Sequence, residues 1–229
     1  MNDTPILEAH GVQKKFDTSL ILRGVDISLK EGEVLAIMGP SGSGKSTLLH
    51  CLAGIIDSTS GSIVYNGRDL TTLNQTDRTK LRRTDFGFIF QFGELVPELP
   101  ILDNVALPLL LRGVKKKEAY STSKEWLDKI DISSISKALP HTLSGGETQR
   151  AAIARAMANN PKVIFADEPT GSLDSINATK VMRLFVELAD QYKKSIIFVT
   201  HSTEMAKYAK RIVMLQDGLI VNDNMPSQT

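Results

Sequence analysis

The chain of 229 residues has one cysteine, few aromatic side chains and almost no net charge. Because Cys51 is the lone cysteine, the sequence excludes an internal disulfide framework and suits a reducing compartment. A formal net charge of +1 gives no electrostatic argument for binding nucleic acid, so we expect no nucleic-acid partner. The rest of the composition, with 41% hydrophobic and 23% charged residues, is that of a globular protein with a sizeable core.

Long hydrophobic runs are also missing. The longest one, near Val105–Leu111, contains Pro108 and is far shorter than the roughly 18 residues that cross a bilayer. Residues 1–5 do not show a basic segment leading into an apolar one, so we expect no secretory signal. Residues 225–229 are expected to form a loose polar tail. These absences predict a cytoplasmic protein without a transmembrane segment of its own.

The glycine-rich segment Gly39–Thr47, with the sequence GPSGSGKST, is the strongest positive signal. It follows the apolar run Val34–Met38 and precedes a segment with helical periodicity, which is the context of a phosphate-binding P-loop. Glycines let backbone N–H groups turn toward a polyphosphate, and the helix N-terminus adds further donors. Lys45 can reach the β- and γ-phosphates, and the Ser46 hydroxyl can ligate Mg²⁺. A Gly/Ser linker that happens to contain a lysine would lack the flanking strand and helix. The predicted phosphate contacts are Gly39, Ser41, Gly42, Gly44, Lys45, Ser46 and Thr47.

Hydrophobic patterning predicts an α/β fold with an all-helical insertion. Short strand-like segments before and after the P-loop suggest an antiparallel sheet beside the nucleotide site. Residues 95–160 contain helical patterns and no β-rich run, whereas strand–helix alternation returns after Pro161. We therefore predict a single domain. Its core, with a parallel sheet and an antiparallel β subdomain, comes from residues 1–94 and 161–229, and its helical subdomain comes from residues 95–160.

Two carboxylates end the apolar run Val163–Ala166. A parallel strand that ends in Asp167-Glu168 places both side chains at the carboxyl edge of the sheet, where α/β proteins bind ligands. We assign Asp167 to Mg²⁺ and Glu168 to the general base that activates water. The alternative is an exposed acidic turn before Pro169.

A second anion-binding helix start is predicted at Leu143–Glu147, with the sequence LSGGE. A serine and two glycines before a helix expose backbone donors, although on its own such an N-cap is common. Three of the four histidines, His10, His50 and His141, have no metal-ligand spacing and are expected to be structural or exposed.

The LSGGE segment resembles the signature motif of ATP-binding-cassette (ABC) ATPases, whose other motifs follow in order across nearly the whole chain. The resemblance implies the ABC ATPase fold, ATP and Mg²⁺ as ligands, and ATP hydrolysis. It implies that Phe16 stacks on adenine, that Gln91 joins the core to the helical lobe and touches Mg²⁺, and that His201 senses the γ-phosphate. Catalysis is thus assigned to Lys45, Glu168 and His201, and the metal to Ser46, Gln91 and Asp167.

The family also implies a head-to-tail dimer. ATP held by the P-loop of one subunit is then closed over by the signature helix of the other, which adds donors and excludes water. The residues expected to contact the second copy across the dimer interface are Ser144, Gly145 and Gly146 of the signature segment and Asp174 of the segment Ser172–Asp174.

We expect ATP hydrolysis by this dimer to drive a membrane permease. The permease is expected to dock near Gln91–Pro100, a stretch that mixes apolar residues, prolines and acids. The chain would then lie on the cytoplasmic side of the membrane. Segments around Gly87–Gln91 and Ala166–Asp174 resemble the branch that drives lipoprotein release, macrolide, antimicrobial-peptide and haem efflux, and a cell-division complex. We favour efflux of haem, an antimicrobial peptide or a macrolide. The alternatives are a lipoprotein-releasing or cell-division complex and, less favoured, a soluble ABC ATPase that serves no transporter.

Overall fold

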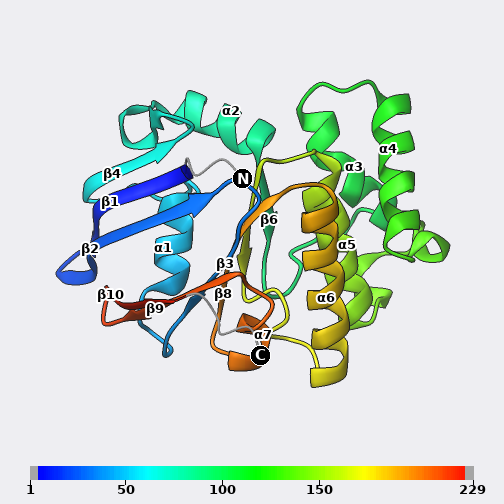
Figure 1. Cartoon of the computed structure of the whole chain (residues 1–229). Coiled ribbons are helices and arrows are strands. Elements are labelled where there is room, and N and C mark those ends of the chain that lie inside the picture. Colours follow the sequence, from blue (N-terminus) through cyan, green and yellow to red (C-terminus); the bar gives the residue numbers. More distant parts are fainter. Residues whose placement is uncertain (1–4, 225–229) are drawn as a thin grey trace.

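Two β-sheets, of four and six strands, form the framework of the molecule (Figure 1). The computed structural model describes residues 5–224, so the expected polar tail and most of the segment considered for a secretory signal lie outside the described residues. Among residues 5–224, no helix combines the length and the apolar character that a membrane crossing requires.

The antiparallel sheet has the strand order β2-β1-β4-β5 and the larger sheet the order β10-β9-β3-β8-β7-β6. In the larger sheet β9, β3, β8, β7 and β6 run parallel, and β10 pairs antiparallel with β9. The strands are β1 Pro5–Phe16, β2 Ser19–Lys30, β3 Val34–Met38, β4 Ser60–Tyr65, β5 Arg68–Asp69, β6 Phe86–Ile89, β7 Val163–Asp167, β8 Ser195–Thr200, β9 Arg211–Gln216 and β10 Leu219–Asn224. The helices are α1 Lys45–Leu52, α2 Gln75–Asp85, α3 Ile101–Leu111, α4 Lys116–Lys129, α5 Gly145–Ala158, α6 Ser175–Gln191 and α7 Thr203–Ala206, with 3-10 turns at Leu70–Thr72, Ser133–Ile135 and Pro140–Thr142.

Alternate residues of the parallel strands enter two different cores, because successive side chains of a strand point to opposite faces. In β3, Leu35 and Ile37 join the core that the antiparallel sheet and α1 cover. Val34, Ala36 and Met38 join the second core, which contains α3, α5 and α6. Both faces of the central strands β3, β7 and β8 are therefore buried, which explains why these strands read as continuous apolar runs.

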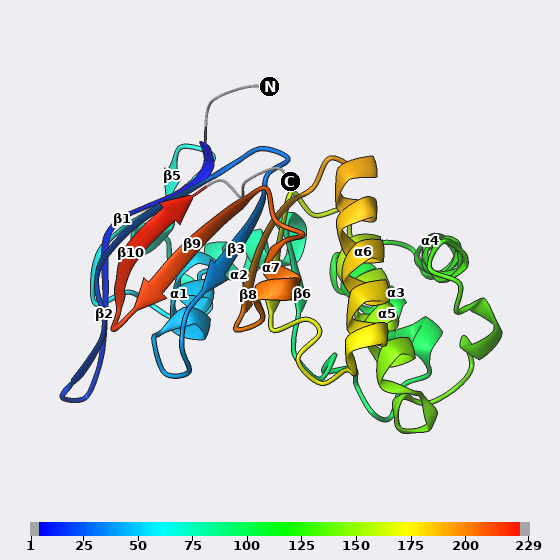
Figure 2. The same cartoon turned by 60° about the horizontal axis from the view of Figure 1, so that its bottom comes forward.

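The helices α3, α4 and α5 lie at the opposite end of the molecule from the antiparallel sheet (Figure 2). The expected fold class, a parallel-sheet core with an antiparallel sheet and an inserted group of helices, is confirmed. Two local features differ from expectation. Pro108 lies inside α3 rather than interrupting it. Helix α2 is not predicted from the sequence, because it has no buried residue and hence no apolar periodicity; it begins where the Asn74 side chain accepts from the Asp77 N–H.

Candidate nucleotide site

The predicted catalytic segments meet at one edge of the larger sheet because they follow neighbouring parallel strands. The P-loop follows β3, His201 follows β8, and Asp167 is the last residue of β7. The strand order places β8 between β3 and β7, and Asp167 is in register with Val199 of β8. The fold thus gathers residues that lie more than 120 positions apart at the ligand-binding edge of an α/β sheet.

The P-loop wraps closely around its lysine. Gly44 caps α1 with a left-handed φ of 102°, a conformation that favours glycine, and its carbonyl accepts the first helical hydrogen bond from Leu48. The Lys45 Nζ is buried in the loop and donates to the carbonyl oxygens of Gly39 at 3.0 Å and Pro40 at 2.8 Å. The ammonium group is therefore held at the point where the loop exposes its backbone donors.

Ser46 and Asp167 offer oxygen donors at the same place. The Ser46 hydroxyl donates to Asp167 Oδ1 at 3.0 Å, and burial raises the pKa of the Asp167 carboxyl despite this hydrogen bond. A hydroxyl and a carboxylate side by side suit Mg²⁺, which prefers oxygen ligands and keeps several waters. These two residues would hold the metal, so the donor set fits the expected ion.

Glu168 and His201 face each other across β7 and β8. His201 Nδ1 lies 3.0 Å from Glu168 Oε1, while Glu168 has a left-handed φ of 44° and its N–H donates to the Val199 carbonyl. A Cβ placed on Gly171 would lie 2.9 Å from Glu168 Oε2 and 3.0 Å from Gln91 Nε2, so a larger residue there would displace the ends of these two side chains. The Gln91 backbone carbonyl in turn accepts from the Ser172 hydroxyl.

A cavity of about 680 Å³ opens over this edge. Phe16 lies at its rim, 46% exposed, and Lys14 Nζ is 4.6 Å from the centre of the Phe16 ring. A cation against one aromatic face stabilises the ring in place. The residues that line the cavity are Phe16, Ile21, Ser41, Gly42, Gly44, Lys45, Ser46, Thr47, Glu168 and His201.

The signature segment is not part of that lining within the described chain. Ser144 caps α5 instead: its hydroxyl and N–H both donate to Glu147 Oε2, and its Oγ accepts from the Glu147 N–H, which completes a capping box. Asp174 caps α6 in the same way, accepting from the N–H groups of Ile176 and Asn177, and these bonds lower the pKa of its carboxyl. Both helix starts are formed and exposed.

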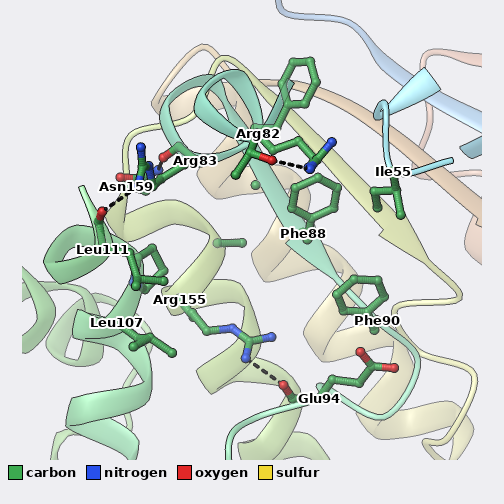
Figure 3. A pocket seen from close by; sticks show the side chains of 15 residues that line it. Ile55, Arg82, Arg83, Phe88, Phe90, Glu94, Leu107, Leu111, Arg155 and Asn159 are labelled. Carbon is green, nitrogen blue, oxygen red and sulfur yellow. Dashed lines mark hydrogen bonds between the residues drawn. The ribbon is translucent and has the colours of Figure 1, made fainter. Parts of the chain in front are cut away.

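A second hollow, of about 580 Å³, lies between α2, β6, α3 and α5 (Figure 3). Figure 3 shows the rings of Phe88 and Phe90 on one side and Leu107 and Leu111 on the other. Arg155 reaches across to the chain after β6, where its guanidinium donates to the carbonyl oxygens of Gly93 and Glu94 at 2.8 and 2.7 Å. The hollow is apolar in its centre and carries guanidinium groups at its edge, the others being Arg82 and Arg83.

The structure brings most predicted site residues together, although their roles stay predictions. Six of the seven predicted P-loop contacts, Ser41 to Thr47 without Ser43, line one cavity together with Phe16, Glu168 and His201. The predicted residues outside that lining are Gly39, Gln91, Ser144, Gly145, Gly146, Asp167 and Asp174. His50, which the sequence predicts to be structural or exposed, lies beside the site, with its Nε2 3.8 Å from Asp167 Oδ2. The signal was available, because His50 follows Ser46 by four residues and therefore shares its face of α1.

Comparison with known proteins agrees with this geometry. A family model described as ABC transporter matches residues 22–171, more than half of the chain. The chain is 42% identical over 223 residues to the lipoprotein-releasing system ATP-binding protein LolD of Alcanivorax borkumensis, covering 96% of this chain and 98% of that protein. It is also 42% identical over 219 residues to the LolD protein of Aquifex aeolicus, covering 95% and 97%. Among solved structures, a dimeric ATP-binding cassette in a post-hydrolysis state with ADP and Pi is 36% identical with a TM-score of 0.88, covering 96% of this chain and 98% of that one.

Proposed function

We infer the function from the premise that this chain belongs to the ABC transporter family, and is an ATPase subunit of such a transporter. We propose that the machine it drives is a lipoprotein-releasing membrane complex. One observation carries this choice: the identity of about 40% to LolD proteins extends over nearly the whole of both chains. The comparisons thus favour the alternative named from the sequence over haem, peptide or macrolide efflux.

In the proposed reaction, the P-loop N–H groups and Lys45 bind the phosphates while Phe16 stacks on the base. Ser46 and Asp167, which are hydrogen-bonded to each other, would hold Mg²⁺, with Gln91 as a further proposed ligand, and the ion would supply positive charge for the β- and γ-phosphates. Glu168 accepts a proton from the attacking water, and His201, already in contact with that carboxylate, orients it toward the γ-phosphate. The shared cavity of about 680 Å³ supports the roles of the P-loop, Phe16, Glu168 and His201, and the hydrogen bond from Ser46 to Asp167 supports the metal site.

The functional unit we propose is a head-to-tail dimer with two ATP molecules between the subunits. Ser144, Gly145 and Gly146 form an exposed anion-binding helix start outside the cavity of their own chain, which suits contact with ATP on a second copy. A similar cassette has been solved as a dimer bound to ADP and Pi. Because ATP would bridge both copies, its hydrolysis removes the free energy that favours the closed state.

The permease is proposed to dock beside Gln91–Pro100, which places the chain on the cytoplasmic face of the membrane. Phe92 in this stretch is 70% exposed, and the apolar hollow of Figure 3 adjoins it through Phe90 and Glu94. Exposed apolar surface of this kind is typical of protein interfaces. The proposed division into residues 1–94 with 161–229 and residues 95–160 makes this hollow the boundary between core and helical subdomain.

The test is to express Glu168→Gln with an affinity tag in the natural host, alongside Glu125→Gln on α4 as a control of equal charge change. Glu168→Gln should trap an ATP-bound dimer with ATP turnover largely abolished. The tagged variant should co-purify with a permease from detergent-solubilised membranes. Lipoproteins should then accumulate in the membrane that contains the permease. Retained turnover would contradict the general-base assignment, export defects without lipoprotein retention would favour efflux, and a monodisperse protein without a membrane partner would refute the transporter function.

A further inference from the structure

We propose that the Glu147 carboxylate competes with ATP for the Ser144 hydroxyl at the start of the signature helix. The hydrogen bond between Ser144 and Glu147 must then break before ATP can close the dimer. Glu147 would thereby set how readily the dimer forms. The inference rests on the proposed function, since it assumes that Ser144 contacts ATP on the second copy. It deepens that function by naming a residue of this chain that opposes closure.

The contact between the two side chains is direct. The Ser144 hydroxyl donates to Glu147 Oε2 at 2.6 Å, and the Ser144 N–H donates to the same oxygen at 2.9 Å. These two bonds hold the pKa of the Glu147 carboxyl below its usual value, so the side chain is ionised at neutral pH. A full negative charge thus lies at the N-terminus of α5, against the positive end of the helix dipole.

The hydroxyl of Ser144 has one proton and can donate to one acceptor at a time. Phosphate oxygens at neutral pH accept hydrogen bonds, so a γ-phosphate can use this hydroxyl only after the bond to Glu147 is broken. A hydrogen bond from a hydroxyl to a carboxylate is roughly twice as strong as one between neutral groups. The bond to Glu147 therefore competes with the bond to ATP rather than adding to it.

Charge adds to the competition. An approaching γ-phosphate meets a carboxylate three residues along the same helix start, and like charges at this range repel. Arg150, one turn further along α5, also attracts the Glu147 carboxylate, and its buried Nε has no hydrogen-bond partner among the described residues. We assign Arg150 as the group that receives the carboxylate when Ser144 turns to the phosphate.

The experiment compares ATP-driven dimerisation by analytical ultracentrifugation in the Glu168→Gln background, where ATP persists. Adding Glu147→Gln keeps the side-chain size and removes the charge. We expect a dimer dissociation constant at least roughly tenfold lower, because both interfaces lose one repulsion and the neutral amide oxygen that remains is a weaker acceptor for the Ser144 hydroxyl than a carboxylate. Adding Glu125→Gln, the same charge change at an exposed site on α4, should leave the constant unchanged. Thermal unfolding without nucleotide checks the α5 cap, and Glu147→Ala replaces Glu147→Gln if the latter fails to fold.

Three further outcomes keep the inference and the proposed function apart. If Glu168→Gln alone forms no ATP-dependent dimer, the proposed dimer itself is wrong. If that dimer forms and adding Ser144→Ala leaves it unaffected, Ser144 does not contact ATP on the second copy, and the inference is overturned with that contact. If Glu168→Gln dimerises and Ser144→Ala weakens the dimer, but the Glu147 variants are no tighter than Glu125→Gln, then Glu147 is only a helix cap and the inference is overturned.

Discussion

His201 Nδ1 lies 3.0 Å from Glu168 Oε1, so the residue expected to sense the γ-phosphate already touches the residue expected to activate water. Neither is fixed by this contact alone. Glu168 is held by its backbone, whose N–H donates to Val199, whereas the His201 side chain is 64% exposed. The imidazole is therefore the more exposed partner, and its Nδ1 contacts one oxygen of a carboxylate that is 22% exposed.

The first prediction concerns that contact. His201→Ala should lower ATP turnover by roughly 10² or more, the range of a lost proton-transfer or orienting group, while ATP affinity changes by only a few fold. Steady-state phosphate release and binding of a fluorescent ATP analogue separate the two effects. The matched control is His10→Ala on β1, an exposed histidine of the other sheet. Unchanged turnover in His201→Ala would remove the residue from the reaction.

The second prediction concerns the metal. Asp167 accepts a hydrogen bond from Ser46, and the two residues are expected to bind the metal together. Changing the Asp167 carboxylate to an amide should therefore weaken Mg²⁺ binding while the P-loop still binds the nucleotide. Asp167→Asn should raise the Mg²⁺ concentration needed for half-maximal turnover by about tenfold or more, and chelation with EDTA should stop hydrolysis in every variant. A Mg²⁺ titration measures this directly, with Asp190→Asn on α6 as the control. An unshifted titration would contradict the assignment of Asp167.

The third prediction concerns the hollow of Figure 3. Leu111 at its edge is 60% exposed, and Leu219 on β10 is 42% exposed at a distant place on the larger sheet. If the permease docks in the hollow, Leu111→Asp should abolish co-purification with the membrane partner and leave ATP-driven dimerisation intact. Leu219→Asp should change neither. Loss of the partner in both variants, or in neither, would place the docking surface elsewhere.

How far the sequence predicts the molecule depends on whether a motif carries its own geometry. The P-loop and the run ending at Asp167 do, because a strand followed by a loop or a carboxylate fixes where the side chains emerge. The polar helix α2 does not, since it buries no residue and shows no apolar period. The hydrogen bond between Ser144 and Glu147 is not predicted either: the sequence predicts an N-cap at this helix start, whereas the structure shows that the Ser144 hydroxyl donates to the Glu147 carboxylate.

The fourth prediction concerns Cys51 on α1. The side chain is 1% exposed, and burial raises its pKa to about 11, so little thiolate exists at pH 8. A thiol reagent such as DTNB should react at least roughly 10²-fold more slowly with the native protein than with the urea-unfolded chain. The absorbance trace gives both rates in one experiment. Rapid labelling of the native protein would contradict the buried placement.

The last prediction concerns the ion pair of Arg211 and Asp223 across β9 and β10. Nε and Nη2 of Arg211 donate to the two Asp223 oxygens at 2.6 and 2.7 Å, and Nη1 reaches the Ser28 carbonyl of β2 at 3.0 Å. The hydrogen bonds from Arg211 lower the pKa of Asp223. Because the folded-state pKa is depressed, the stabilisation is present above the unfolded value of about 3.9 and is lost as the pH falls through the lower folded value.

Asp223→Asn should therefore lower the free energy of unfolding at pH 7 by about 0.5–1 kcal/mol, a modest value because solvent screens a pair of this kind. The Asp223 side chain is 43% exposed, which accounts for the discount. Melting temperature should fall by about 1–4 °C. The difference between the two proteins should shrink as the pH drops below about 4, since the native carboxylate then also gains its proton. Asp217→Asn, in the turn between the same strands, controls for the charge change; a deficit that persists unchanged at pH 2.5 would show that Asp223 stabilises the hairpin by something other than its charge.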